Sequence, residues 1–220
     1  MNSQSIIPPA APERAGSRWR AGINRQSTIQ KVVVIAASAG GIDALTQVLT
    51  RLPADLRAAI IVVQHLRDDR ATNLPMHLDH LSPLRVCLAE HGMPIKPAKV
   101  YIANPGKHLS VRNGTMFMDT GNKVNYVRPS ADILFSSTAK AYGCGVIGVI
   151  LSGTGSDGMQ GCKEIKAKGG KIIAQDEKTS KYFGMPRAAI KVNIVDYVLP
   201  LTEIAGKIIE LTSDEQTIED

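Results

Sequence analysis

The stretch of residues 31–41, KVVVIAASAGG, constrains the fold more than any other part of the chain. Residues 32–37 form a continuous run of β-branched and small apolar side chains, which is typical of a strand buried on both faces of a parallel sheet. After Ser38 and three small residues, apolar side chains recur at helical spacing over residues 42–52. This order predicts an α/β fold in which Ser38 lies at the carboxyl end of a strand, where reacting groups gather in open α/β sheets.

The rest of the chain repeats the alternation of apolar runs and amphipathic segments. Residues 83–128 interrupt it, and the Asn-Pro-Gly and Arg-Asn-Gly turns in this stretch indicate hairpin-like segments at the edge of the sheet. We therefore expect a doubly wound, mostly parallel sheet with helices on both faces and an antiparallel β-hairpin at one edge. The further predicted strands are 58–65, 143–153, 171–176 and 194–199, and the further predicted helices are 72–82, 128–143, 158–169, a helix starting near Pro186, and 202–212.

The two ends of the chain differ from this pattern. Residues 1–30 mix Pro, Ala, Gly, Ser and Arg without periodicity, which predicts a flexible tail or the remnant of a linker. Residues 31–212 are expected to form one domain, and residues 213–220 an acidic tail. Four arginines against one glutamate give residues 1–30 a net charge of +3, and six acids against Lys207 give residues 203–220 a net charge of −5.

The total charge of +6 therefore leaves +8 on residues 31–202. Such a surface favours an acidic partner or serves only for solubility, and the lack of aromatic residues among the basic ones argues against nucleic acid. The scattered Cys87, Cys144 and Cys162 match neither a disulfide framework nor a C-x-x-C metal site. No segment has the apolar length of a membrane span or of a secretory signal. We expect a soluble cytoplasmic protein with reduced thiols, no metal and no cofactor.

Ser38 has more than one interpretation. It can cap the following helix while Gly40 and Gly41 allow the turn to close. It can also be a nucleophile, which requires a base elsewhere in the chain. A phosphate-binding turn is a third option, although neither G-x-G-x-x-G nor G-x-x-x-x-G-K-[ST] occurs here.

Two further polar residues follow predicted strands. His65 ends the second strand, and Asp157 lies in the glycine-rich loop after the strand of residues 143–153. Taken alone, His65 can be structural and Asp157 can cap the next helix. Together with Ser38 they have the placement that a Ser-His-Asp apparatus requires, provided that the order of strands brings them to neighbouring positions.

Six ordered segments carry a resemblance to a known family: IAASAGGIDAL, VVQH, YIANPGKHL, VRPSADILFSS, GVILSGTGSDGMQG and AQDEKTSKYFGMPRAAI. They span about residues 31–212, and the combination resembles the catalytic domain of the chemotaxis protein-glutamate methylesterase family. The resemblance implies a mostly parallel α/β sheet with an antiparallel hairpin. It also implies a triad of Ser38, His65 and Asp157. Backbone N–H groups of Ala39 and Thr154 are the candidates for the oxyanion hole.

The resemblance further implies hydrolysis of glutamate γ-methyl esters on the cytoplasmic helices of chemoreceptors, and deamidation of certain receptor glutamines. Family members often carry a phospho-receiver domain ahead of the catalytic domain, whereas this sequence has about 30 unpatterned residues there. Control by a separate regulatory receiver protein is one expectation that follows. The alternatives are a non-catalytic receptor-docking module of the same fold and a nucleotide-binding α/β domain that uses Gly40 and Gly41.

Overall fold

The computed structural model describes residues 31–66 and 72–213. The tails expected for residues 1–30 and 213–220 lie outside the described residues, apart from Ser213. The described residues form a seven-stranded sheet in which every pair of neighbouring strands is parallel. From one edge to the other, its strands are β3 (Arg85–Leu88), β4 (Lys99–Ile102), β2 (Ala58–Gln64), β1 (Lys31–Ala37), β7 (Val146–Ile150), β8 (Lys171–Gln175) and β9 (Tyr197–Leu199).

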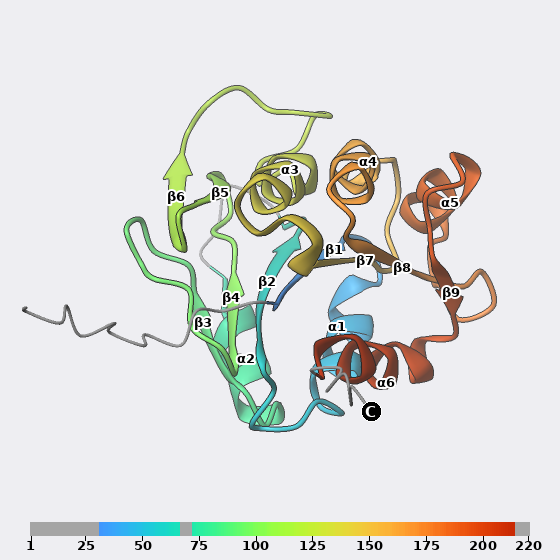
Figure 1. Ribbon diagram of the computed structural model, residues 1–220, viewed down its shortest axis with the longest axis horizontal. Coiled ribbons are helices and arrows are strands. Elements are labelled where there is room, and N and C mark those ends of the chain that lie inside the picture. The colour runs from blue at the N-terminus through green and yellow to red at the C-terminus, as the bar shows by residue number, and fades with distance from the viewer. Residues whose placement is uncertain (1–30, 67–71, 214–220) are drawn as a thin grey trace, which may run out of the picture.

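Helices cover both faces of this sheet, so the predicted fold class is confirmed (Figure 1). The helices α3 (Ala131–Tyr142), α4 (Met159–Ala167) and α5 (Gly184–Lys191) lie on one face. The helices α1 (Gly41–Leu49), α2 (Leu74–Leu81) and α6 (Leu201–Thr212) lie on the other. A short 3₁₀ turn, η1 (Gly143–Gly145), connects α3 to β7.

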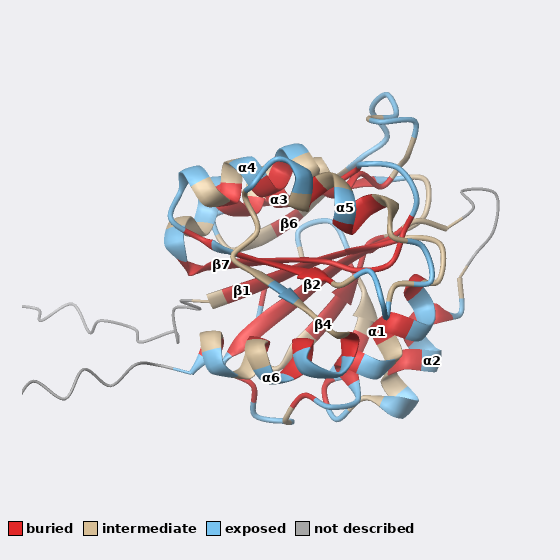
Figure 2. Ribbon diagram, turned by 90° about the vertical axis from the view of Figure 1, so that its right-hand side faces the viewer, coloured by how far each residue is buried: buried red, intermediate tan, exposed pale blue. Residues whose placement is uncertain are grey.

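Burial follows the sequence pattern closely. Every residue of β2 is buried, and so is every residue of β1 after Lys31 (Figure 2). Alternate residues of each strand enter separate hydrophobic clusters, so that Val33 and Ile35 pack toward α1 and α6 whereas Val32 and Val34 pack toward α3 and α4. A strand with apolar contacts on both faces needs a continuous apolar run, which explains the sequence of residues 32–37.

The excursion between residues 83 and 128 was predicted only in part. Its first two strands, β3 and β4, are parallel members at the edge of the main sheet. Only β5 (His108–Arg112) and β6 (Thr115–Asp119) form an antiparallel hairpin, which is a separate two-stranded sheet packed beside α3. The prediction of a hairpin at the Arg-Asn-Gly turn is confirmed. The prediction at the Asn-Pro-Gly turn is wrong, because the chain leaves the main sheet there.

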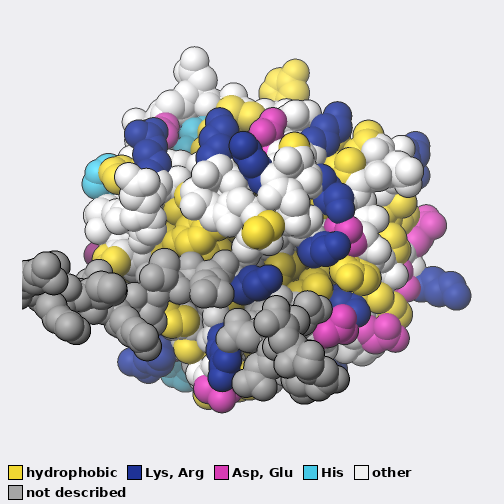
Figure 3. All heavy atoms as spheres, in the orientation of Figure 1, with side chains coloured by type: hydrophobic (Ala, Val, Ile, Leu, Met, Phe, Trp, Pro, Cys, Tyr) yellow, Lys and Arg dark blue, Asp and Glu magenta, His cyan; other side chains and the backbone are white. Residues whose placement is uncertain are grey.

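Basic side chains are prominent on the surface that Figure 3 presents. The helix α4 and the turn that follows it carry lysines at positions 163, 166 and 168, and Lys171 begins β8. Asp196 pairs with Lys166 at 2.6 Å and with Lys171 at 3.8 Å. Within residues 31–66 and 72–213, no helix is long and apolar enough to cross a membrane.

The helices α3 and α4 touch at a glycine. A Cβ placed on Gly161 would overlap the Cβ of Phe135 and would lie 3.2 Å from the backbone of Asp132. We expect Gly161→Ala to lower the free energy of unfolding by about 1–2 kcal/mol, since overpacking outweighs the better helix propensity of alanine. Urea unfolding measures this change.

Gly206 in α6 is the matched control, because a Cβ there meets no atom within 4 Å. Gly206→Ala should raise the free energy of unfolding by about 0.5–1 kcal/mol. If both substitutions were stabilising, the close contact between α3 and α4 would be contradicted.

Candidate active site

The carboxyl ends of β2, β1 and β7 meet at one edge of the sheet, and the polar residues singled out in the sequence follow these strands. Ala37 of β1 is paired with Gln64 of β2, so the next residues, Ser38 and His65, lie beside each other. The His65 N–H donates to the Ala37 carbonyl at 2.9 Å. Order and register of the sheet thus bring two of the three predicted side chains to one place.

The turn after Ser38 is packed by the protein itself. Gly40 has a φ of 70°, which is the left-handed region that favours glycine. A Cβ on Gly40 would come within 2.9 Å of the Ser152 hydroxyl, and a Cβ on Gly41 would overlap the Gln64 side chain. The N-cap residue of α1 is Gly40, without a side-chain hydrogen bond, so the interpretation of Ser38 as a helix cap is wrong.

Ser38 is also tied to β7. Its N–H donates to the Ser152 carbonyl at 3.0 Å, and the Ser152 hydroxyl donates to the Ala39 carbonyl at 2.8 Å. The Tyr182 N–H donates in turn to the Ser152 hydroxyl at 3.0 Å. Ser152 therefore joins the turns that follow β1, β7 and β8, and the Ser38 hydroxyl has no hydrogen-bond partner among the described residues.

His65 and Asp157 are in direct contact although 92 positions separate them. The His65 Nε2 lies 2.8 Å from the Asp157 Oδ2, and both side chains are largely buried, with 12% and 4% exposure. A carboxylate accepts, so Nε2 carries the proton. The Nδ1 atom is then the basic nitrogen, and it has no hydrogen-bond partner among the described residues.

Asp157 does not cap the helix that follows it. The N-cap residue of α4 is Gly158, which has no side-chain cap, whereas the Asp157 carboxylate lies at the amino end of α3. Its Oδ2 accepts the Ala131 N–H at 2.6 Å, and its Oδ1 accepts the Ser130 hydroxyl at 2.7 Å. The amino end of a helix carries unpaired N–H groups and a partial positive charge, both of which stabilise a carboxylate.

These contacts set the protonation of Asp157. Burial alone would raise the pKa of this carboxyl, but the hydrogen bonds from His65, Ala131 and Ser130 outweigh burial and hold the pKa below its usual value of 3.8. Asp132 has the opposite shift, because burial and the neighbouring Asp157 charge raise its pKa against the hydrogen bond that it accepts from Gly161. Asp157 therefore keeps its charge to a lower pH than Asp132 does.

Two backbone N–H groups point to where a negative oxygen can be held. The Ala39 and Thr154 N–H groups donate to no acceptor among the described residues. They flank the Ser38 turn, since a Cβ on Gly153 would come within 2.9 Å of the Ser38 Cβ. Unpaired N–H groups beside a nucleophile are what an oxyanion hole needs.

Sequence reasoning missed the roles of Gln64, Ser130 and Asn125. Gln64 Nε2 donates to the carbonyls of Ser38 at 2.9 Å and of His65 at 3.1 Å, which joins the two turns. Asn125 Nδ2 donates to Asp157 Oδ1 at 3.2 Å. Gln64 stands in the VVQH segment and Ser130 in the VRPSADILFSS segment, so both carried a signal, whereas Asn125 carried none.

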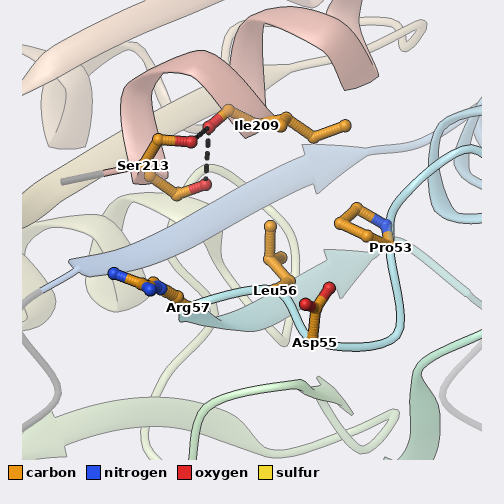
Figure 4. Close-up of a pocket in the computed structure, with 7 residues that line it drawn as sticks. Pro53, Asp55, Leu56, Arg57, Ile209 and Ser213 are labelled. Carbon is orange, nitrogen blue, oxygen red and sulfur yellow. Dashed lines mark hydrogen bonds between the residues drawn. The ribbon is translucent and has the colours of Figure 1, made fainter. Parts of the chain in front are cut away.

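Two pockets of the described surface lie away from these residues. One is a hollow between the loop before β2 and the end of α6, at the amino-terminal edge of the sheet, lined by Pro53, Asp55, Leu56, Arg57, Ile209, Thr212 and Ser213 (Figure 4). A second lies between the β5–β6 hairpin and α3. Within the described ranges, no three or more His, Cys, Asp or Glu side chains are grouped to hold a metal ion. The candidate site lies at the carboxyl ends of the strands, apart from these two pockets.

Comparison with known proteins shows relatives of this chain in both sequence and fold. Residues 33–208 match the family described as CheB methylesterase. The fold superimposes on the crystal structure of the Thermotoga maritima CheB methylesterase catalytic domain with a TM-score of 0.79 and 42% identity, covering 82% of this chain and 98% of that one.

Curated relatives are similar at the sequence level. A protein-glutamate methylesterase/protein-glutamine glutaminase of Thermotoga maritima is 40% identical over 196 residues, which are 87% of this chain and 57% of that protein. The protein-glutamate methylesterase FrzG of Myxococcus xanthus is 42% identical over 180 residues, which are 81% of this chain and 54% of FrzG. The chain thus spans little more than half the length of these relatives.

The hydrogen bonds around Asp157 predict a pH-dependent contribution to stability. Asp157→Asn keeps one acceptor oxygen but turns an amide N–H₂ toward buried donors, so it should cost about 1–3 kcal/mol of unfolding free energy at pH 6. A carboxyl whose pKa is lowered on folding stabilises the fold above its unfolded pKa. The difference from wild type should therefore shrink as the pH falls below 3.8 through the lower folded pKa.

Urea unfolding between pH 6 and pH 3 tests this expectation. Glu177→Gln is the control, because Glu177 is exposed on the loop after β8 and should show no such gap at any pH. A gap between Asp157→Asn and wild type that stayed constant down to pH 3 would contradict a charged Asp157 in the folded state.

Proposed function

Since the chain belongs to the CheB methylesterase family, we propose that it is a serine hydrolase that removes the methyl group from glutamate γ-methyl esters of chemoreceptors. The observation that carries the proposal is the 2.8 Å contact between His65 and Asp157 beside Ser38. A buried, charged carboxylate that accepts from an imidazole leaves the other ring nitrogen basic, which is what a serine hydroxyl needs for activation.

The reaction follows from these groups. The Ser38 oxygen attacks the ester carbonyl while His65 Nδ1 takes the hydroxyl proton, and Asp157 stabilises the imidazolium. The Ala39 and Thr154 N–H groups hold the oxyanion. His65 then gives its proton to the leaving methoxide, so that methanol departs and a glutamyl ester of Ser38 remains. A water molecule, deprotonated by His65, hydrolyses this ester and releases a free glutamate.

The same site can take a glutamine in place of the ester. The attack on the γ-carbonyl is identical, and His65 protonates the leaving amine to ammonia rather than methoxide to methanol. Several relatives are named protein-glutamine glutaminases, which supports deamidation as a second activity. If the substrates are the cytoplasmic helices of chemoreceptors, the protein acts in the cytoplasm. A separate receiver protein can regulate it there.

The two other candidate functions have weaker support. A nucleotide-binding turn needs backbone that is open to phosphate, whereas the Gly40 turn is filled by Lys181 and Ser152. A non-catalytic docking module does not require a charged Asp157 held against His65 by buried hydrogen bonds.

Replacement of the nucleophile is the direct test. Ser38→Ala should lower the release of methanol from methylated receptor by at least about a thousandfold, because members of a catalytic triad act as a unit. The Ser38 hydroxyl makes no hydrogen bond with described residues, so the thermal unfolding midpoint should stay close to that of wild type.

Ser136→Ala, on α3 at the second pocket, is the control and should keep full activity. Labelling of wild type by a fluorophosphonate, and its loss in Ser38→Ala, gives a second readout. Comparable turnover by Ser38→Ala would rule the proposal out in favour of a docking module.

Gln64 should matter for rate rather than for binding. Gln64→Met keeps the length of the side chain but removes the donor that joins the Ser38 and His65 carbonyls. A small displacement of either group should lower kcat about 10- to 100-fold with KM nearly unchanged. Steady-state kinetics on methylated receptor measure both constants.

Gln47→Met, an exposed glutamine on α1, is the matched control and should change neither constant. A fall in kcat of Gln64→Met that disappeared when unfolded protein was removed would indicate a purely structural role for Gln64.

A further inference from the structure

The connection between β6 and α3 contains a tight turn with an unusual residue. The N–H groups of Val124 and Val127 donate to each other's carbonyls at 3.2 and 3.0 Å, so Asn125 and Tyr126 are the two central residues. Their φ angles are 51° and 65°. Turns with two positive φ angles favour Asn-Gly, and a tyrosine at the second position is disfavoured because its Cβ crowds the backbone.

Nothing within the described residues compensates for this tyrosine. Its side chain is 96% exposed, more than any other large hydrophobic residue of the described ranges. The connection that carries it projects from the molecule beyond α3 (Figures 1 and 2). The backbone of Tyr126 is strained and its ring is open to water, so this residue does not stabilise the free protein. We therefore look for a role of the ring in a contact with another molecule.

The base of this connection is fixed by two basic side chains. Arg128 Nη1 donates to the carbonyls of Thr120 at 2.8 Å and Gly121 at 2.7 Å. The buried His108 donates from Nε2 to the Asn122 carbonyl at 2.9 Å and accepts the Ser130 N–H at Nδ1. The connection is thereby held to the amino end of α3.

The tip of the connection is tied to the reacting groups. Asn125 Nδ2 donates to Asp132 at 2.7 Å and to the Asp157 carboxylate at 3.2 Å. Tyr126 follows Asn125 in the chain, so it lies next to a residue that contacts the Asp157 carboxylate, which in turn binds His65. These contacts hold the backbone that carries Tyr126 beside Asp157.

The substrate of the proposed reaction has to pass over this part of the surface. A glutamyl side chain is short, so the helix that carries the ester must come close to the protein surface when the ester reaches Ser38. Tyrosine offers a large contact area at low cost in side-chain entropy, and such residues dominate the energetics of protein contacts.

We propose that Tyr126 contacts the substrate helix and sets the affinity for it, packing its ring on the helix surface beside the esterified glutamate. This inference rests on the proposed function, because it requires a helical protein substrate at Ser38. It assigns Tyr126 a role in binding a protein segment and none in the bond-breaking steps.

The test compares two substrates on the full chain. The first is a synthetic helical peptide rich in Ala and Glu with one glutamate γ-methyl ester, and the second is p-nitrophenyl acetate, which has no helix for Tyr126 to contact. Tyr126→Gly creates the favoured Asn-Gly turn, so the thermal midpoint should be equal or higher. Its KM for the peptide should rise about tenfold, whereas hydrolysis of p-nitrophenyl acetate should be unchanged.

Three further variants sharpen the result. Tyr126→Asn also suits a left-handed backbone and should behave as Tyr126→Gly does, whereas Tyr126→Phe should keep most of the affinity. Val198→Ala removes an exposed apolar side chain, 48% exposed, on the edge strand β9 and should leave both substrates unaffected. In the Ser38→Ala background, Tyr126→Gly should weaken binding of the peptide about tenfold without any turnover.

The outcomes separate the two proposals. If Tyr126→Gly processes and binds the peptide as wild type does, the role of Tyr126 is overturned while the hydrolase stands. If wild type hydrolyses neither substrate and is not labelled at Ser38, the proposed function fails and the inference falls with it. An equal loss on both substrates would show that Tyr126 acts on the reacting groups and would overturn a role in helix binding.

Discussion

The carboxylate of Asp157 is the group on which the geometry of the candidate site depends. It accepts hydrogen bonds from an imidazole on β2's turn and from a hydroxyl and a backbone N–H at the start of α3. Such a charge is costly to bury unless it is fully hydrogen-bonded, and the amino end of a helix meets this need. Asp157 lies just before α4, and its carboxylate is bound by the start of α3. The close approach of α3 and α4 at Gly161 therefore supports the site as well as the fold.

Much of the fold could be predicted from the sequence because a strand that is buried on both faces of a parallel sheet requires a continuous apolar run. The runs at residues 32–37 and 58–64 contain few alternatives to a buried strand, and the structure places them at the centre of the sheet. The strand β4 was harder to assign. Its four residues precede an Asn-Pro-Gly turn that is typical of hairpins, and only tertiary contacts with β2 and β3 decide that it runs parallel.

The positions of the candidate site residues could also be predicted, because these residues follow strands with clear apolar runs. Ser38, His65 and Asp157 follow strands that are clear in the sequence, and these strands are neighbours in the sheet. The direction of the Asp157 side chain could not be predicted, since a residue before Gly158 is a natural cap for α4 and instead faces α3. The role of Asn125 could not be predicted either, because its contact with Asp157 joins residues far apart in the chain and leaves no local pattern.

The central strand β1 has β2 on one side and β7 on the other, and β7 begins only at Val146. In a nascent or truncated chain that ends before this residue, β1, which is buried along its length after Lys31, has one edge of its backbone unpaired. Such an edge is a template for pairing with other chains, so incomplete products should be prone to aggregate and to need chaperones until the second half of the protein is made.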